Sequence, residues 1–179
     1  MDEELKIIWI DGQFGVGKTA TANLIVQKKD QAYLLEFDTL QKTYKPQTEI
    51  EMISAFFGPT YPEAKAYLIK EFKRTIQKIV SDNRYNYLVI PIALINDLCR
   101  KELVEFYTDI DNYHFILTAT DDVIKHRASN QDNRDMNLVL THMQTAKAYL
   151  NTHYPDAVRI DTSNIGIDQV VEKIIEIID

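Results

Sequence analysis

The sequence predicts an α/β fold, a single domain in which helices cover both faces of a parallel sheet. The chain has 179 residues, which is the length of one ordinary domain. Short apolar runs alternate with longer stretches of helical periodicity along the sequence. The runs are continuously apolar, as expected of strands that are buried on both sides in a parallel sheet. There is no linker or internal repeat, so residues 1–179 are interpreted as one domain.

Five apolar runs predict the strands, and each interval between them is wide enough for a helix. The predicted strands are Ile7 to Ile10, Tyr33 to Phe37, Tyr87 to Ile92, Phe115 to Ala119, and Ala157 to Ile160. Helices are predicted over residues 17–29, 61–81, 97–107, 121–128, 135–151 and 167–178. The last helix has the clearest pattern, because its apolar residues recur every three or four positions.

Charge and composition disfavour several classes of partner. The chain has 20 basic and 27 acidic residues, a net charge of −7. An acidic chain without a long basic run is a poor candidate for binding nucleic acid or an anionic membrane surface. No apolar run approaches the ~20 residues that cross a bilayer, and the acidic N-terminus does not resemble a signal peptide. The single cysteine, Cys99, fits a reducing compartment. We therefore expect a cytoplasmic protein, whose oligomeric state the sequence does not indicate.

One sequence motif predicts a functional site. Directly after the first predicted strand, residues 12–19 match G-x-x-x-x-G-K-[ST], the phosphate-binding P-loop. Glycines let backbone N–H groups turn toward an anion, and the positive end of the following helix points to the same place. Lys18 is expected to reach the β- and γ-phosphates, and the Thr19 hydroxyl to hold Mg²⁺. The predicted nucleotide-binding residues here are Gly12, Gln13, Phe14, Gly15, Val16, Gly17, Lys18, Thr19 and Ala20. The alternative is a glycine-rich turn with an exposed lysine.

The P-loop and its surroundings resemble those of a known family. The chain has neither the Asn-Lys-x-Asp signal of GTPases nor the Leu-Ser-Gly-Gly signature of transporters. Residues 7–19 look like the opening of the bacterial tunicamycin-resistance protein family, among the P-loop nucleotide and small-molecule kinases. The likeness continues in Leu88 to Ile92, Phe115 to Arg127, and Arg159 to Ser163, and so covers most of the chain. It implies a three-layer, kinase-like P-loop NTPase fold with strand order 2-3-1-4-5, and ATP and Mg²⁺ as cofactors.

The resemblance also implies an acceptor site near the end of the second strand. In similar kinases the position of Asp38 contacts the acceptor or takes its proton, although an Asp there also caps helices well. Its neighbours Asp11 and Glu36 are interpreted as structural or solvated. Residues 40–62, rich in aromatic side chains, correspond to an acceptor-binding lobe or to a small satellite core. The third strand ends without the carboxylate with which many P-loop enzymes hold Mg²⁺, and Asp97 is the first acid downstream.

Residues 120–135 look like the lid of small kinases. Arg127 and Arg134 are predicted to close over the transferring phosphoryl group, because a guanidinium stays charged and grips phosphate in a fork. We then expect Arg127→Ala to lower kcat more than it raises the KM for ATP. The alternative is that both arginines pair with nearby aspartates on a solvated surface. Thr162 and Ser163, after the fifth strand, resemble the loop that backs the adenine, and with Arg127 they complete the predicted cofactor-binding set.

Two functions remain open at this point. The first is a phosphotransferase that moves the γ-phosphoryl group of ATP to a small molecule, either nucleoside-like, nucleotide-like or an antibiotic. Its catalytic residues would be Lys18, Asp38, Arg127 and Arg134. The second is an ATP-dependent binding protein that sequesters an antibiotic such as tunicamycin without turnover. The arginines and Asp38 favour catalysis, whereas the bare tip of the third strand favours binding. A scaffold with a vestigial nucleotide site is a third, weaker alternative.

Overall fold

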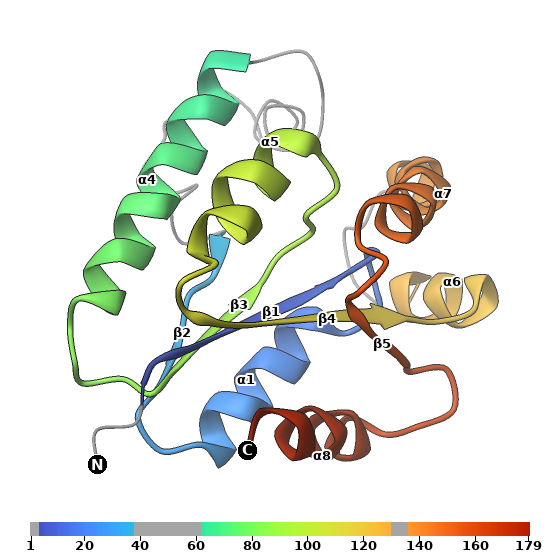
Figure 1. The fold of residues 1–179 in the computed structure, drawn as a ribbon. Coiled ribbons are helices and arrows are strands. Elements are labelled where there is room, and N and C mark those ends of the chain that lie inside the picture. Colours follow the sequence, from blue (N-terminus) through green and yellow to red (C-terminus); the bar gives the residue numbers. More distant parts are fainter. Residues whose placement is uncertain (1–3, 38–61, 130–135) are drawn as a thin grey trace.

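The protein is a three-layer α/β structure built around a five-stranded sheet (Figure 1). The computed structural model describes residues 4–37, 62–129 and 136–179. All strand pairs are parallel, and the order β2-β3-β1-β4-β5 confirms the predicted one. The strands are β1 (Lys6–Gly12), β2 (Ala32–Leu34), β3 (Tyr87–Pro91), β4 (Asp111–Thr118) and β5 (Val158–Asp161).

Helices cover both faces of this sheet. Helices α1 (Lys18–Lys28) and α8 (Ile167–Ile178) lie on one face, and α4 (Pro62–Val80) and α5 (Asp97–Cys99) lie on the other (Figure 1). Helices α6 (Asp121–Ser129) and α7 (Met136–His153) connect β4 to β5. Among the described residues, no helix combines the length and the apolar character that a membrane crossing requires.

The central strand β1 shows why the apolar runs are continuous. Ile7 and Trp9 are fully buried in the core on the α4 side of the sheet. Ile8 and Ile10 are fully buried in the core on the α1 side. Because successive side chains of a strand point to opposite faces, a strand that is covered on both faces needs apolar residues at every position.

Three elements differ clearly from their predicted form. Strand β4 begins at Asp111 rather than at Phe115. The added residues include Asn112 and His114, polar side chains that interrupt the apolar run but bind residues of β1. The helix predicted over 97–107 is three successive helical segments, because α5 continues into a π-helix (Arg100–Val104) and a 3₁₀ turn (Glu105–Tyr107). Strand β2 is also shorter than predicted, ending at Leu34.

Candidate phosphate-binding site

The P-loop joins the end of β1 to the start of α1, the strand–helix junction that the motif requires. Gly12 is indispensable here for two reasons. Its φ of +137° is one that residues with a side chain rarely adopt, and an added Cβ would lie 2.4 Å from the carbonyl oxygen of Leu117 in β4. Only glycine lets the loop turn this close to the neighbouring strand.

The N-terminus of helix α1 lacks the side chains that usually stabilise a helix start, and its features favour a bound anion instead. Gly17 caps it in a left-handed conformation, with φ 103° and ψ 18°, and contributes no side-chain hydrogen bond. The first turn contains no acidic residue and begins with Lys18. Acidic residues are the ones that stabilise the positive end of a helix, so a cation there is locally unfavourable. Such a break in a local rule is expected where a bound anion supplies the missing negative charge.

The Lys18 ammonium is folded back over the loop. Its Nζ donates hydrogen bonds to the carbonyl oxygens of Gly12 and Gln13, both at 2.9 Å. The Phe14 ring lies 5.5 Å from the same nitrogen. These contacts fix the direction of the charge, so little side-chain entropy remains to be lost when a phosphate binds.

Thr19 and Ala20 lie in the first turn of α1 and are exposed. The exposed Thr19 hydroxyl fits the role of a single Mg²⁺ ligand, since this ion is commonly held by one or two protein groups together with substrate phosphates. The part of the chain that the structure describes contains no group of three or more His, Cys, Asp or Glu side chains that could hold a metal ion alone.

Arg127 is bound to the loop that follows β5. Its Nη2 donates to the carbonyl oxygen of Thr162 at 2.8 Å, and its Nη1 donates to the Thr162 hydroxyl at 3.0 Å. The same Nη1 lies 3.4 Å from the carbonyl oxygen of Val16 in the P-loop. The Thr162 side chain is buried and donates to the carbonyl oxygen of Thr118 at the end of β4. Arg127 and Thr162 therefore tie the P-loop to the ends of β4 and β5.

Ser163 completes this junction. Its Oγ accepts a hydrogen bond from the Thr120 N–H, and its own N–H donates to Asp161, at 2.9 and 2.8 Å. Hydrogen bonds from Ser163 hold the pKa of the Asp161 carboxyl below its ordinary value of 3.8. The side chains of Thr162 and Ser163 and most of their backbone polar groups are thus used internally. Their role behind the adenine stays a prediction.

Arg127→Ala tests where this arginine acts. Because its guanidinium is bonded to Thr162 and faces Val16, we expect the variant to weaken ATP binding by about three- to tenfold, the value of one or two hydrogen bonds. Arg127→Lys should not restore affinity, since a point charge cannot form the paired bonds. Calorimetric titration with ATP measures the effect, with the exposed Arg84→Ala as the control. A lower kcat at unchanged affinity would instead support the transition-state role predicted from the sequence.

Asp11, interpreted from the sequence as structural or solvated, proves to be the centre of a buried network. Its side chain is completely buried. Oδ1 accepts hydrogen bonds from the N–H groups of Gly12 at 2.6 Å and Leu94 at 3.1 Å, and Oδ2 lies 3.0 Å from Nε2 of His114. One carboxylate thus joins the first P-loop glycine, the segment after β3, and β4. In the sequence, the polar residues Asn112 and His114, two positions apart in β4, were the features that could have indicated this network.

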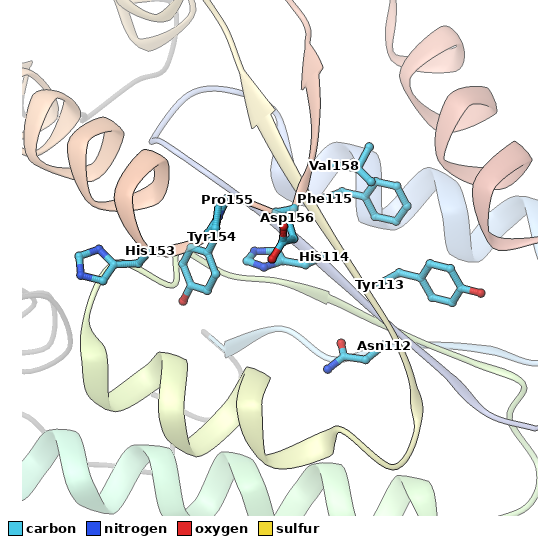
Figure 2. Close-up of a pocket in the computed structure, with 10 residues that line it drawn as sticks. Asn112, Tyr113, His114, Phe115, His153, Tyr154, Pro155, Asp156 and Val158 are labelled. Carbon is cyan, nitrogen blue, oxygen red and sulfur yellow. The ribbon is translucent and has the colours of Figure 1, made fainter.

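A cavity of about 350 Å³ is lined by His114 and its neighbours in the first half of β4 and by residues 153–158, which lead into β5 (Figure 2). Figure 2 shows His114 beside Tyr154, and their ring centroids are 4.5 Å apart. The Tyr154 hydroxyl donates to the carbonyl oxygen of Leu94 at 3.0 Å, and burial raises the pKa of this tyrosine. No P-loop residue lines the cavity, so it is separate from the candidate phosphate site.

Asp97, the first acid downstream of the tip of β3, is bonded to residues of α7 and of the following π-helix. Its carboxylate accepts a hydrogen bond from the Tyr149 hydroxyl at 2.8 Å and lies 3.7 Å from the Arg100 guanidinium. The hydrogen bond from Tyr149 lowers the pKa of Asp97, while partial burial raises the pKa of Tyr149 to about 12. Asp97 therefore connects α5 to α7. Two predicted site residues, Asp38 and Arg134, lie outside the described residues, as do positions 40–61 of the predicted acceptor lobe and 130–135 of the predicted lid.

Solved structures resemble this one over almost its whole length. The tunicamycin resistance protein of Deinococcus radiodurans superposes with a TM-score of 0.71 and 22% identity, covering 97% of this chain and 95% of that chain. A gluconokinase from Sinorhizobium meliloti 1021 superposes with a TM-score of 0.64 and 15% identity, covering 96% and 89%. The fold is that of the P-loop kinases. The structural likeness to a tunicamycin-resistance protein, expected from the sequence, is confirmed.

A third structural neighbour was solved with ligands. The Mycobacterium tuberculosis APS kinase in complex with AMPPNP and APS superposes with a TM-score of 0.63 and 18% identity, covering 98% of both chains. No protein-family model and no curated protein sequence matches the chain. At these identities the likeness establishes the P-loop kinase fold, and the chemistry must be argued from the residues themselves.

Proposed function

We propose that the protein binds ATP and Mg²⁺ through its P-loop and transfers the γ-phosphoryl group to a small molecule. The observation that carries the proposal is the Lys18 ammonium, held by the carbonyl oxygens of Gly12 and Gln13 at the positive end of α1. A fixed cation and a helix N-terminus together favour a polyphosphate over a neutral ligand. ATP is abundant in the cytoplasm, where the single cysteine also suggests that the protein resides.

In the proposed reaction, an oxygen of the acceptor attacks the γ-phosphorus, the bond to the β-phosphate oxygen breaks, and ADP leaves. Lys18 and a Thr19-held Mg²⁺ would offset the charge that moves onto the leaving phosphate. Asp38 would take the proton of the acceptor, and Arg134 would meet the charge on the transferring group. The gluconokinase and APS kinase neighbours are named for small acceptors, which supports this substrate class.

The test has two stages. Calorimetric titration should give saturable ATP binding that Mg²⁺ strengthens. ADP release is then followed against a panel of nucleosides, nucleotides, sugars and tunicamycin, and one acceptor should raise it well above the rate in water. Absence of any ATP binding would refute the proposal at its first step.

ATP-dependent sequestration is the second candidate, favoured by the tip of β3. The strand ends at Pro91, and the nearest downstream acid, Asp97, is bound to Tyr149. A missing Mg²⁺-holding carboxylate weakens catalysis more than binding. The neighbour named for tunicamycin resistance supplies the ligand to try. Tunicamycin binding that requires ATP and releases no ADP would decide for sequestration.

A further inference from the structure

One buried polar atom of the P-loop has no partner. The Gln13 residue is only 5% exposed, and its side-chain oxygen Oε1 is buried without a hydrogen bond to any of the described residues. Most buried polar atoms in proteins are paired, and an unpaired one destabilises the folded state. Asp11 and Thr162, buried polar residues at the same end of the sheet, have several hydrogen bonds each. The orphaned oxygen of Gln13 is therefore a local exception that calls for an explanation.

Gln13 lies where the P-loop meets the end of β3. Its own carbonyl oxygen holds the Lys18 ammonium at 2.9 Å. The preceding residue, Gly12, shares the Asp11 carboxylate oxygen with the N–H of Leu94, three residues beyond the end of β3 at Pro91. The loop thus begins beside the strand end that lacks a carboxylate.

We propose that Gln13 Oε1 is the acceptor for an O–H group that arrives with the ligand of the P-loop. An amide oxygen can only accept hydrogen bonds, whereas the oxygens of ATP phosphates are largely deprotonated at neutral pH and cannot donate. The O–H donors that remain are a water molecule bound to Mg²⁺, a hydroxyl of the small-molecule acceptor, and the ribose hydroxyls of the nucleotide. A ribose donor would be lost from metal-free AMPPNP binding as well, which separates it from the other two. This inference rests on the proposed function. It makes Gln13 a side-chain determinant of binding, beyond the backbone role that the P-loop motif assigns to its position.

Loss of the Gln13 side-chain oxygen should have opposite effects on the free protein and on the complex. In the free protein the unpaired oxygen is a cost, so replacing it with an apolar group of similar length should leave the melting temperature unchanged or raise it. In the complex the same replacement removes a hydrogen bond. A residue that serves only to pack the loop would not separate these two quantities.

The experiment compares Gln13→Met with the wild-type protein by calorimetry and thermal melting. The probes are AMPPNP with Mg²⁺ and AMPPNP in EDTA. If the donor is metal-bound water, Gln13→Met should weaken Mg²⁺–AMPPNP binding by about three- to tenfold and leave metal-free binding unchanged. Gln27→Met, at an exposed position of α1, is the matched control and should change neither affinity.

A third probe, tunicamycin added in the presence of Mg²⁺–AMPPNP, tests the acceptor hydroxyl as the source. Weaker tunicamycin binding with unchanged nucleotide affinity would assign the donor to the acceptor. If all three probes bind Gln13→Met as they bind the wild type, the inference is overturned. Wild-type protein that fails to bind Mg²⁺–AMPPNP refutes the proposed function instead, so the two failures are distinguishable.

A second variant keeps the proposal testable if Gln13→Met fails to fold. Gln13→Glu keeps an accepting oxygen of the same reach and adds a negative charge. We expect it to raise the ratio of Mg²⁺–AMPPNP affinity to metal-free AMPPNP affinity, because the carboxylate attracts the hydrated ion and repels bare phosphates. An unchanged ratio in a folded Gln13→Glu protein would contradict placement of the oxygen beside the metal-bound end of the nucleotide.

Discussion

Lys18→Ala is expected to weaken ATP binding by about ten- to a hundredfold. The ammonium already points over the P-loop in the free protein, held by Gly12 and Gln13. Hydrogen bonds to charged groups contribute about 1.5–3 kcal/mol, and the variant loses those to the phosphates while freeing two loop carbonyls that Lys18 had held. ADP release, wherever an acceptor is found, should fall further than affinity, since charge on the phosphates grows as the bond breaks.

Lys28→Ala is the matched control for this effect. Lys28 ends the same helix and forms a solvent-accessible ion pair with Asp168, so its removal should leave ATP affinity unchanged. Both variants are titrated with ATP by calorimetry under identical salt. Equal affinities for Lys18→Ala and the wild type would mean that residues 12–19 do not hold the phosphates.

Asp11→Ala should produce the largest loss of stability, about 3–5 kcal/mol in the free energy of unfolding. The change leaves two buried N–H groups, of Gly12 and Leu94, and the His114 ring without their shared acceptor. Asp11→Asn keeps one accepting oxygen and should lose less. Because the P-loop starts at Gly12, ATP affinity should fall in parallel with stability in this pair of variants.

Denaturant unfolding measures this loss, with the fluorescence of Trp9 as the probe. Trp9 is the single tryptophan and is fully buried, so its environment changes on unfolding. Asp111→Ala is the control, since Asp111 is an exposed acid at the start of β4. Similar unfolding free energies for Asp11→Ala and Asp111→Ala would show that the buried network contributes little.

The features that could be predicted from the sequence depend either on a short contiguous motif or on a periodic pattern of apolar residues. The P-loop is a contiguous motif, and the positions of the strands and long helices follow from apolar runs and repeats, although the bounds of β2 and β4 differ from those predicted. The strand order came from resemblance, because alternation of strands and helices alone does not specify which strands are neighbours. It was confirmed by the pairing of β1 with β3 and β4.

The missed features depend on pairs that are distant in the chain. Asp11 meets His114, and Trp9 meets Asn112, only because the register of β1 on β4 aligns them. Read as a sequence, Asn112 and His114 look like an interruption before the strand, whereas in the structure they serve buried groups of β1. Likewise, a hydrogen-bond deficit such as that of Gln13 is invisible until burial is known.

The central place of β1 has a consequence for synthesis of the chain. Lys6 pairs with Tyr87 on one side and with Asp111 on the other, so β1 leaves the ribosome well before either of its partner strands has been made. At ~5–20 residues per second this interval lasts several seconds, during which an apolar strand with two open edges is exposed. Parallel pairing over such separations is also intrinsically slow. Nascent chains of this protein should therefore depend on a holding chaperone at least until β3 has emerged.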